Sequence, residues 1–380
     1  MSTSIRVYLD SSDFSNLSQP SGKNTALMRN IRSKLINWVK KGEIEIRYSM
    51  AHIMEAVPVD LKTAELGRRR LDCIRQLCGK KVFTDPITLV TQELSQSSDV
   101  PLTSDRGHWF PGMTKLWDET VDLTPEPLDS RNERRLLRSA IKSDAQFNNE
   151  LQDLLDNYPI TKKYAVAWLT KQQPGDSVAR AIQNSVSDLD FLCEWYIKHW
   201  NKSTLYSTAI REQGKEFSGL LTTAARDMKA LHLELENEGV KSSEAQKRLT
   251  ACAKKLAENM SQEVVDGLSK EDVPPASIVS ASLESTPSIY VFSELLTQIF
   301  LTSVVTVKNT RKARDSDLGD LMHSIYLPYV DIFRADGATA SALHNAQIGT
   351  TAKIVTSLED LVTEVEARIT LRKQSKPISV

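Results

Sequence analysis

Two short apolar segments near opposite ends of this 380-residue chain are each followed within a few residues by an aspartate. Ile5–Leu9 runs directly into Asp10, and Val330–Phe333 is followed shortly by Asp336. Short runs of apolar and β-branched residues are typical of buried strands. Side chains just past the carboxyl ends of parallel strands converge on one crevice. We therefore expect an α/β fold in which these two acids, far apart in sequence, meet.

Strands and helices are expected to alternate at both ends of the chain. The remaining predicted strands are 43–48, 81–83 and 352–356. Apolar residues at helical spacing predict helices at 24–39, 50–56, 61–77, 289–305, 317–327, 338–346 and 357–369. The residues directly after Asp10, Ser11–Asp13, are interpreted as a turn. This alternation favours a mostly parallel sheet covered by helices.

The middle of the chain has a different character, because residues 130–268 show helical spacing almost throughout. Two long antiparallel helices, around 217–256, are expected to meet at Gly239, with Ser242 or Ser243 opening the second. Their apolar seam is Phe217, Leu221, Ala224, Met228, Leu231 and Leu235 on one helix, and Ala245, Leu249, Cys252 and Leu256 on the other.

The simplest organisation is one α/β domain interrupted by a helical insertion. The predicted boundaries are 1–93 for the first half of the domain, 94–287 for the insertion with its linkers, 288–372 for the second half and 373–380 for a flexible tail. The linkers are rich in Pro and Ser, and the first contains Trp109 and Phe110. These aromatics could stack on unpaired bases or anchor an irregular loop to the core.

Bulk composition limits the classes of function. With 48 basic and 49 acidic residues the formal net charge is −1, so affinity for a polyanion requires a local basic surface. The four cysteines form no C-x-x-C pair, which argues against a zinc site. No basic leader with an apolar core opens the sequence, and we find no stretch of about eighteen apolar residues. A cytoplasmic location and no membrane span are expected.

Two further acids complete a proposed cluster. Glu55 lies on the helix after the second strand, and Asp320 lies on the helix before Val330–Phe333. Carboxylates hold Mg²⁺ or Mn²⁺, which lowers the pKa of bound water and neutralises charge on a reacting phosphodiester. Because the chain has 49 acidic residues, chance spacing is a serious alternative. The position of Asp10 and Asp336 just after strands favours the cluster.

These segments resemble the motifs of PIN-domain nucleases. Val7–Ser12 resembles the family's opening strand, Glu55 falls where its helix-borne glutamate belongs, and Asp317–His323 and Ile332–Asp336 are similar to its two late aspartate motifs. The resemblance covers roughly the first and the last ninety residues. It implies a three-layer, Rossmann-like α/β/α domain, metal-dependent ribonuclease activity, and Asp10, Glu55, Asp320 and Asp336 as catalytic metal ligands. Two departures are Arg334–Ala335 where the family usually has Thr or Ser, and the large insertion.

Neighbouring side chains have candidate secondary roles. Asp13 and Asp317 could assist the metal, or could simply cap a turn and a helix. His323 lies one helical turn beyond Asp320, where it could donate to phosphate or be a packed helix residue.

Basic residues near the late motifs are expected to contact the phosphates of a substrate. The chosen candidates are Arg311, Lys312, Arg314 and Arg334, together with Lys308. Arg68–Arg70 and the arginines of 131–138 are further candidates, although solvated helix faces are the commoner use of such runs.

Two functions of different classes follow. The first is a metal-dependent endonuclease that hydrolyses phosphodiester bonds through Mg²⁺ or Mn²⁺, with single-stranded RNA preferred because of the family resemblance. The alternative is a catalytically inactive PIN-like scaffold whose helices around 217–256 bind a protein partner or a second copy.

Overall fold

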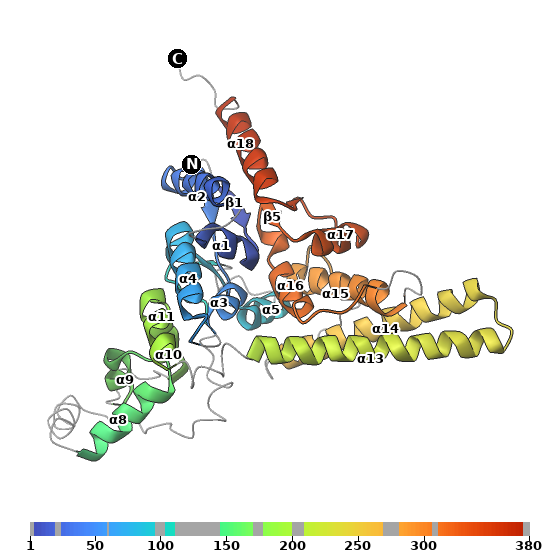
Figure 1. The fold of residues 1–380 in the computed structure, drawn as a ribbon, viewed down its shortest axis with the longest axis horizontal. Coiled ribbons are helices and arrows are strands. Elements are labelled where there is room, and N and C mark those ends of the chain that lie inside the picture. The colour runs from blue at the N-terminus through green and yellow to red at the C-terminus, as the bar shows by residue number, and fades with distance from the viewer. Residues whose placement is uncertain are drawn as a thin grey trace.

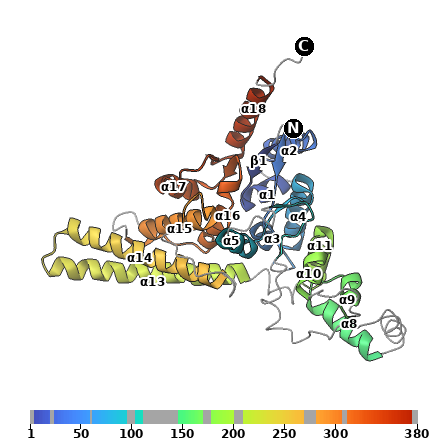
Figure 2. The same cartoon turned by 180° about the vertical axis from the view of Figure 1, so that it is seen from behind.

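The protein is an α/β molecule in which a small sheet is surrounded by many helices (Figures 1 and 2). The computed structural model describes residues 4–19, 24–58, 61–95, 103–110, 145–169, 178–199, 209–268, 281–305 and 311–374. Three limbs extend from a common centre in Figure 1. One carries both ends of the chain and the sheet, and the other two are formed by the helices from the middle of the chain.

Four parallel strands form the main sheet, in the order β2-β1-β5-β6. They are β1 (Ile5–Tyr8), β2 (Ile44–Ile46), β5 (Ile332–Arg334) and β6 (Lys353–Val355). The chain builds β1 and β2 first and returns much later to the other side of β1. The strand order therefore reverses between β1 and β5, and such a switch point is where α/β sheets bind ligands.

A second, two-stranded sheet continues the β2 edge. It pairs β3 (Val82–Phe83) antiparallel with β4 (Thr103–Ser104), and an isolated parallel bridge joins Tyr48 to Val82. Every strand expected from the sequence is present with slightly different bounds, whereas β4 was not expected. The predicted α/β class with a mostly parallel sheet is confirmed.

The two faces of the sheet are buried in two separate cores. Along β1, Ile5 and Val7 point into the first core and Tyr8 into the second, which is the two-residue alternation of a strand. The first face is covered by α1 (Ser11–Ser18), α2 (Thr25–Lys40), α3 (Met50–Ala56), α4 (Ala64–Cys78) and α18 (Leu358–Gln374). The second is covered by α5 (Pro86–Ser95), α15 (Pro287–Phe300), α16 (Asp317–Ser324) and α17 (Gly337–Asn345).

Helices from the middle of the chain extend both cores. In Figure 1 they form two limbs on different sides of the sheet. The first limb comprises α8 (Ala145–Asn157), α9 (Lys162–Leu169), α10 (Val178–Val186) and α11 (Leu189–Lys198), and joins the first core beside α4. The second comprises α13 (Ala209–Asn237) and α14 (Ser242–Leu268). Of these, α14 packs on α15, and α13 packs on Leu301–Val305, which continues α15, and on α16.

The predicted antiparallel pair is confirmed as α13 and α14 (Figure 1). Gly239 adopts a φ of 81° between them, a left-handed conformation that favours glycine. Part of the predicted seam was wrong, because Leu231, Cys252 and Leu256 are exposed. His232, Ala253 and Ala257 are buried instead. The buried face rotates around each helix over its length, because both helices also pack against α15 or its continuation.

One further expectation was wrong. Ser11–Asp13 is no isolated turn but the first turn of α1, where the Asp10 backbone N–H donates to Asp13 Oδ2 at 2.9 Å. Among the described residues, one helical segment, Pro287–Val305, is long and apolar enough to cross a membrane by length and composition, with a mean hydropathy of 1.5 over a window of eighteen residues. This segment is α15 with its π-helical continuation η2 (Leu301–Val305), and 67% of that window is buried in the protein. Its packing in the second core accounts for its composition.

Two glycines in α13 allow a matched test of how closely this helix approaches the segment before α16. A Cβ at Gly214 would collide with the backbone carbonyl oxygen of Asp315, whereas a Cβ at Gly219 would meet open space. Gly214→Ala is expected to lower the free energy of unfolding by about 1–3 kcal/mol, because backbone must move. Gly219→Ala is expected to raise it by about 0.5–1 kcal/mol through helix propensity. Denaturant unfolding of both variants measures this, and equal effects would contradict the close contact.

Candidate functional site at the carboxyl edge of the sheet

Two of the predicted acids start helices on either side of the switch point. Asp10 follows β1 and is the N-cap residue of α1, and Asp336 follows β5 and is the N-cap residue of α17. Asp336 Oδ1 accepts a hydrogen bond of 2.7 Å from the backbone N–H of Thr339. Carboxylates are favoured at helix N-termini because the free N–H groups and the helix dipole stabilise negative charge. Both acids therefore lie at the edge where ligands bind in such sheets.

Asp320, in the first turn of α16, shares this space. Burial and the like charges of Asp336 and Asp10 raise the pKa of the Asp320 carboxyl to about 7. Asp336 and Asp10 thus both act electrostatically on Asp320, although the three acids come from separate elements. Asp320 also lines a cavity of about 310 Å³ together with Arg311 and Thr339.

Glu55 on α3 approaches the same helix from the other side of the site. Its Oε1 would lie only 2.5 Å from a Cβ on Gly319, so the absence of a side chain at Gly319 makes room for it. Its Oε2 lies 3.5 Å from Nε2 of His323. Burial alone would raise the pKa of Glu55, but the hydrogen bond and charge of His323 lower it to about 2. Glu55 is therefore an anion paired with His323.

Arg334 sits among the acids of α1, where a substrate contact was expected. Its Nη1 lies 3.2 Å from Asp10 Oδ2, and its Nε lies 3.0 Å from Asp13 Oδ1. The second pair is in ionic contact without hydrogen-bond geometry, since neither atom has a hydrogen-bond partner. Burial raises the pKa of Asp13 to about 7 even though the Arg334 charge lowers it. Arg334 is only 11% exposed and is engaged by these two acids, and its expected contact with a substrate stays a prediction.

A second internal pair involves Arg311 and Asp317. Arg311 Nη1 and Nη2 donate to the two carboxylate oxygens of Asp317 at 2.7 and 2.6 Å. The backbone N–H of Arg314 donates to the same carboxylate at 3.0 Å, and the Asp317 side chain is fully buried. Asp317 therefore fastens the segment before α16, and the expected metal and phosphate roles of Asp317 and Arg311 conflict with this bidentate pair. Lys312 and Arg314 have exposed side chains, and Lys308 lies outside the described residues.

A buried chain of hydrogen bonds connects β1 to His323. His52 Nε2 lies 2.7 Å from the carbonyl oxygen of Leu9, which can only accept, so Nε2 carries the proton and Nδ1 is an acceptor. The Ser49 hydroxyl lies 2.9 Å from that Nδ1 and 3.0 Å from the Tyr8 hydroxyl. Tyr8 in turn lies 2.6 Å from His323 Nδ1. The backbone N–H of Ser49 also donates to His52 Nδ1 at 2.9 Å, so the Ser49 and Tyr8 hydroxyls can be oriented in either direction along the chain that ends at His323 Nδ1.

This chain fixes the ring of His323. Its other nitrogen, Nε2, lies 3.2 Å from the Ser11 hydroxyl and faces Glu55. Burial lowers the pKa of His323, but the hydrogen bond and charge of Glu55 outweigh that effect and raise it. The ring is thus held as a donor that orients Glu55, in place of the phosphate contact expected from the sequence. Tyr8, Ser49 and His52 could not be found from the sequence, because local spacing does not indicate that a strand tyrosine, an N-cap serine and a helix histidine meet.

The carboxylates of the site are not arranged as a preformed metal-binding site. Within the part of the chain that the structure describes, no group of three or more His, Cys, Asp and Glu side chains is placed to hold a metal ion. Asp10 is paired with Arg334 and Glu55 with His323. The chemistry of the donor set still suits a hard cation, because Asp10, Asp320 and Asp336 supply oxygen ligands whose charges repel one another. Binding a cation there would require the Asp10–Arg334 pair to open.

No family model matches this chain, and comparisons with curated proteins and with solved structures found no match. The resemblance to PIN-domain nucleases therefore stays a prediction from sequence motifs.

Two fully buried tyrosines test the hydrogen-bond chain. Tyr8→Phe removes the hydroxyl that links Ser49 to His323, and is expected to lower the free energy of unfolding by about 1–3 kcal/mol because buried polar partners remain unsatisfied. Tyr48→Phe is the matched control, since the Tyr48 hydroxyl is buried without a hydrogen-bond partner among the residues that the structure describes. It should change stability by less than about 0.5 kcal/mol or increase it. Urea unfolding measures both, and a Tyr48→Phe loss as large as that of Tyr8→Phe would disprove the assignment.

Proposed function

We propose that this protein is a metal-dependent nuclease that hydrolyses phosphodiester bonds at the carboxyl edge of its sheet. The observation that carries the proposal is the raised pKa of Asp320 at the switch point, caused by burial and by the like charges of Asp336 and Asp10. Strongly perturbed carboxyls in such a place are candidates for functional groups. A buried acid with a pKa of about 7 beside two like charges needs a positive partner, and a divalent cation supplies one.

Asp10, Asp320 and Asp336 are the residues that would hold Mg²⁺ or Mn²⁺. Such an ion, when bound, provides an activated water and neutralises charge on the phosphate oxygens. The guanidinium of Arg334 supplies the positive charge that pairs with Asp10 and Asp13. Asp13 accepts from the Asp10 backbone and so fixes the start of α1, which orients the Asp10 side chain. Glu55, fixed by His323, adds negative charge beside α16 and acts by positioning.

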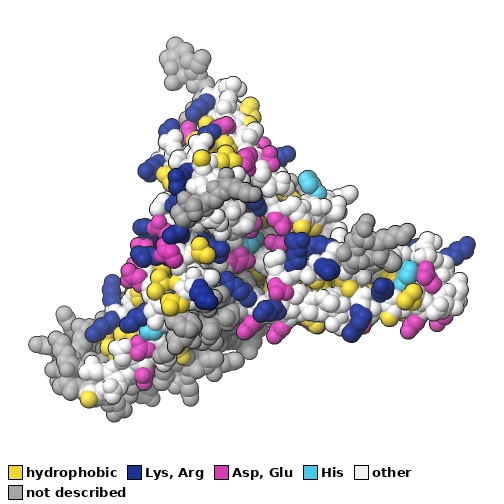
Figure 3. Space-filling view, in the orientation of Figure 1, with side chains coloured by type: hydrophobic (Ala, Val, Ile, Leu, Met, Phe, Trp, Pro, Cys, Tyr) yellow, Lys and Arg dark blue, Asp and Glu magenta, His cyan; other side chains and the backbone are white. Residues whose placement is uncertain are grey.

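The expected substrate is single-stranded RNA, as the resemblance of the motifs implies. The face of the molecule in Figure 3 shows basic and acidic side chains interspersed. Together with a net charge of −1, this favours binding by a few local contacts over a long basic stripe. Lys312 and Arg314, exposed just before α16, are suited to such contacts.

A second candidate function is an inactive scaffold that binds a protein partner or a second copy. Two observations favour it. Arg334 neutralises two acids of the site. The α13–α14 hairpin also exposes Leu220, Leu231, Leu233, Leu256 and Val264. The cleavage experiment below separates the two candidates, because a scaffold has no metal-dependent activity.

The proposed chemistry predicts a specific loss of cleavage. Asp320→Asn and Asp336→Asn should each reduce Mn²⁺-dependent cleavage of a single-stranded oligoribonucleotide at least about a hundredfold, since each removes an oxygen ligand and its charge. Glu359→Gln, an exposed acid on α18, is the control and should cleave like the wild type. Circular dichroism verifies folding of all three. Cleavage that survives EDTA, or an Asp320→Asn variant with normal activity, would refute the nuclease proposal.

A further inference from the structure

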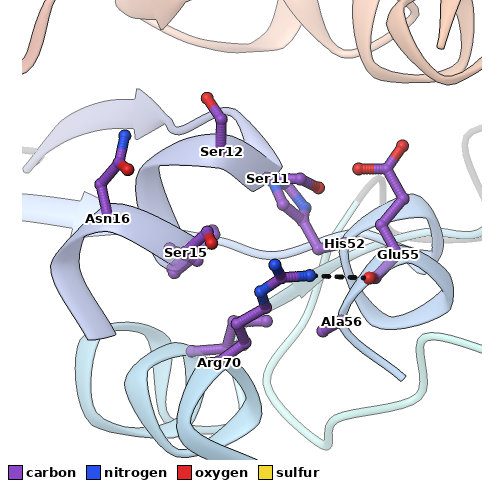
Figure 4. A pocket seen from close by; sticks show the side chains of 10 residues that line it. Ser11, Ser12, Ser15, Asn16, His52, Glu55, Ala56 and Arg70 are labelled. Carbon is purple, nitrogen blue, oxygen red and sulfur yellow. Dashed lines mark hydrogen bonds between the residues drawn. The ribbon is translucent and has the colours of Figure 1, made fainter. Parts of the chain in front are cut away.

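A cavity adjoins the carboxyl edge between α1, α3 and α4 (Figure 4). Its volume is about 270 Å³. One wall is the polar face of α1, which contributes Ser11, Ser12, Ser15 and Asn16. Ser11 and Ser12 directly follow Asp10 in the sequence, so this wall of the cavity begins beside the proposed site. Its buried floor includes Phe14 and Ile74.

The hydroxyls nearest Asp10 are already engaged. Ser12 donates to Asp10 Oδ2 at 2.6 Å, and Ser11 lies 3.2 Å from His323. Ser15 and Asn16, one turn further along α1, make no side-chain hydrogen bond to any described residue. They are therefore available as donors to a ligand.

Arg70 on α4 supplies the positive charge of the cavity. In Figure 4 its guanidinium lies between Ser15 and Ala56, and its one marked bond is to the backbone oxygen of Glu55 at 3.4 Å. No acidic side chain among the described residues pairs with it. The Glu55 carboxylate points away from Arg70 in Figure 4, in keeping with its pairing to His323. The cavity thus holds an arginine whose charge has no acidic partner within the described part of the chain.

Neighbouring arginines of the same run differ from Arg70. Arg69 forms an ion pair of 2.9 Å with Glu65 one turn earlier on α4, and Arg68 is exposed. Among Arg68, Arg69 and Arg70, only Arg70 lines the cavity. Arg68 and Arg69 therefore belong to the solvated face of α4, whereas Arg70 faces the cavity at the carboxyl edge.

We propose that this cavity binds a backbone phosphate of the nucleic-acid strand, next to the phosphodiester that is cleaved. The inference rests on the proposed nuclease function and adds a substrate subsite to it. A guanidinium matches the geometry of a phosphate and binds it through charge-assisted hydrogen bonds. Ser15 and Asn16 provide neutral donors on the opposite wall, suited to the oxygens of the same phosphate or its ribose. The cavity has room for one sugar-phosphate unit and is too polar on its α1 wall to favour an apolar ligand.

The test is a binding measurement that does not depend on catalysis. Fluorescence anisotropy follows a labelled single-stranded oligoribonucleotide titrated with intact protein in EDTA, over a series of salt concentrations. Arg70→Gln should weaken binding about tenfold and reduce the slope of log affinity against log salt by about one, because one phosphate contact is lost. Arg69→Gln carries the same charge change on the same helix and should stay within about twofold of the wild type.

The outcomes separate this subsite from the nuclease proposal. Equal affinities for Arg70→Gln and Arg69→Gln, or no binding by the wild type, would overturn the subsite. Arg70-dependent binding without metal-dependent cleavage would support the subsite and refute the nuclease function. A ribonucleoside monophosphate is also titrated into the wild-type complex. If the monophosphate binds the wild type through Arg70 at least as tightly as the strand does, the cavity belongs to a free nucleotide and the assignment to a strand is wrong.

Discussion

Repulsion between carboxylates at one edge of a small parallel sheet is the interaction on which the rest of the site depends. Asp10, Asp320 and Asp336 come from opposite ends of the chain, and the return of the chain to the free side of β1 brings them together. The protein offsets part of this charge internally, since Arg334 pairs with Asp10 and Asp13. Within the described residues Asp320 forms no ion pair with an arginine or lysine, and its raised pKa is the consequence of burial beside like charges.

Two sets of internal contacts position the elements that carry Asp320 and Glu55. The bidentate Arg311–Asp317 pair fastens the start of α16, and Asp315 just before it accepts a hydrogen bond of 2.6 Å from Ser218 on α13. The long hairpin therefore touches the segment that carries Asp320. On the other side, Tyr8 in β1 fixes His323 and through it Glu55. The acids are thus positioned by both cores of the protein, including helices from the middle of the chain.

Much of the fold could be predicted because apolar periodicity reports directly on burial. All the expected strands and most helix bounds agree with the structure, including the turn at Gly239. The polar helix α1 was missed because Ser and Asp at its start also form turns. The roles of charged residues could not be predicted, since a sequence does not show which cation faces which acid. Arg334 and Asp317, expected at a substrate and a metal, instead form buried internal ion pairs.

The most direct measurement of the central claim is the thermal unfolding midpoint of the wild type and Asp320→Asn at about pH 8, with and without Mn²⁺. A carboxyl whose folded pKa is raised to about 7 stabilises the fold at low pH and loses that contribution as pH rises through 7, so it is charged and destabilising at pH 8. Without metal, Asp320→Asn should therefore melt several degrees above the wild type. Mn²⁺ should raise the midpoint of the wild type and not that of the variant. A wild-type midpoint indifferent to Mn²⁺, with Asp320→Asn no more stable, would contradict a cation site built on carboxylate repulsion.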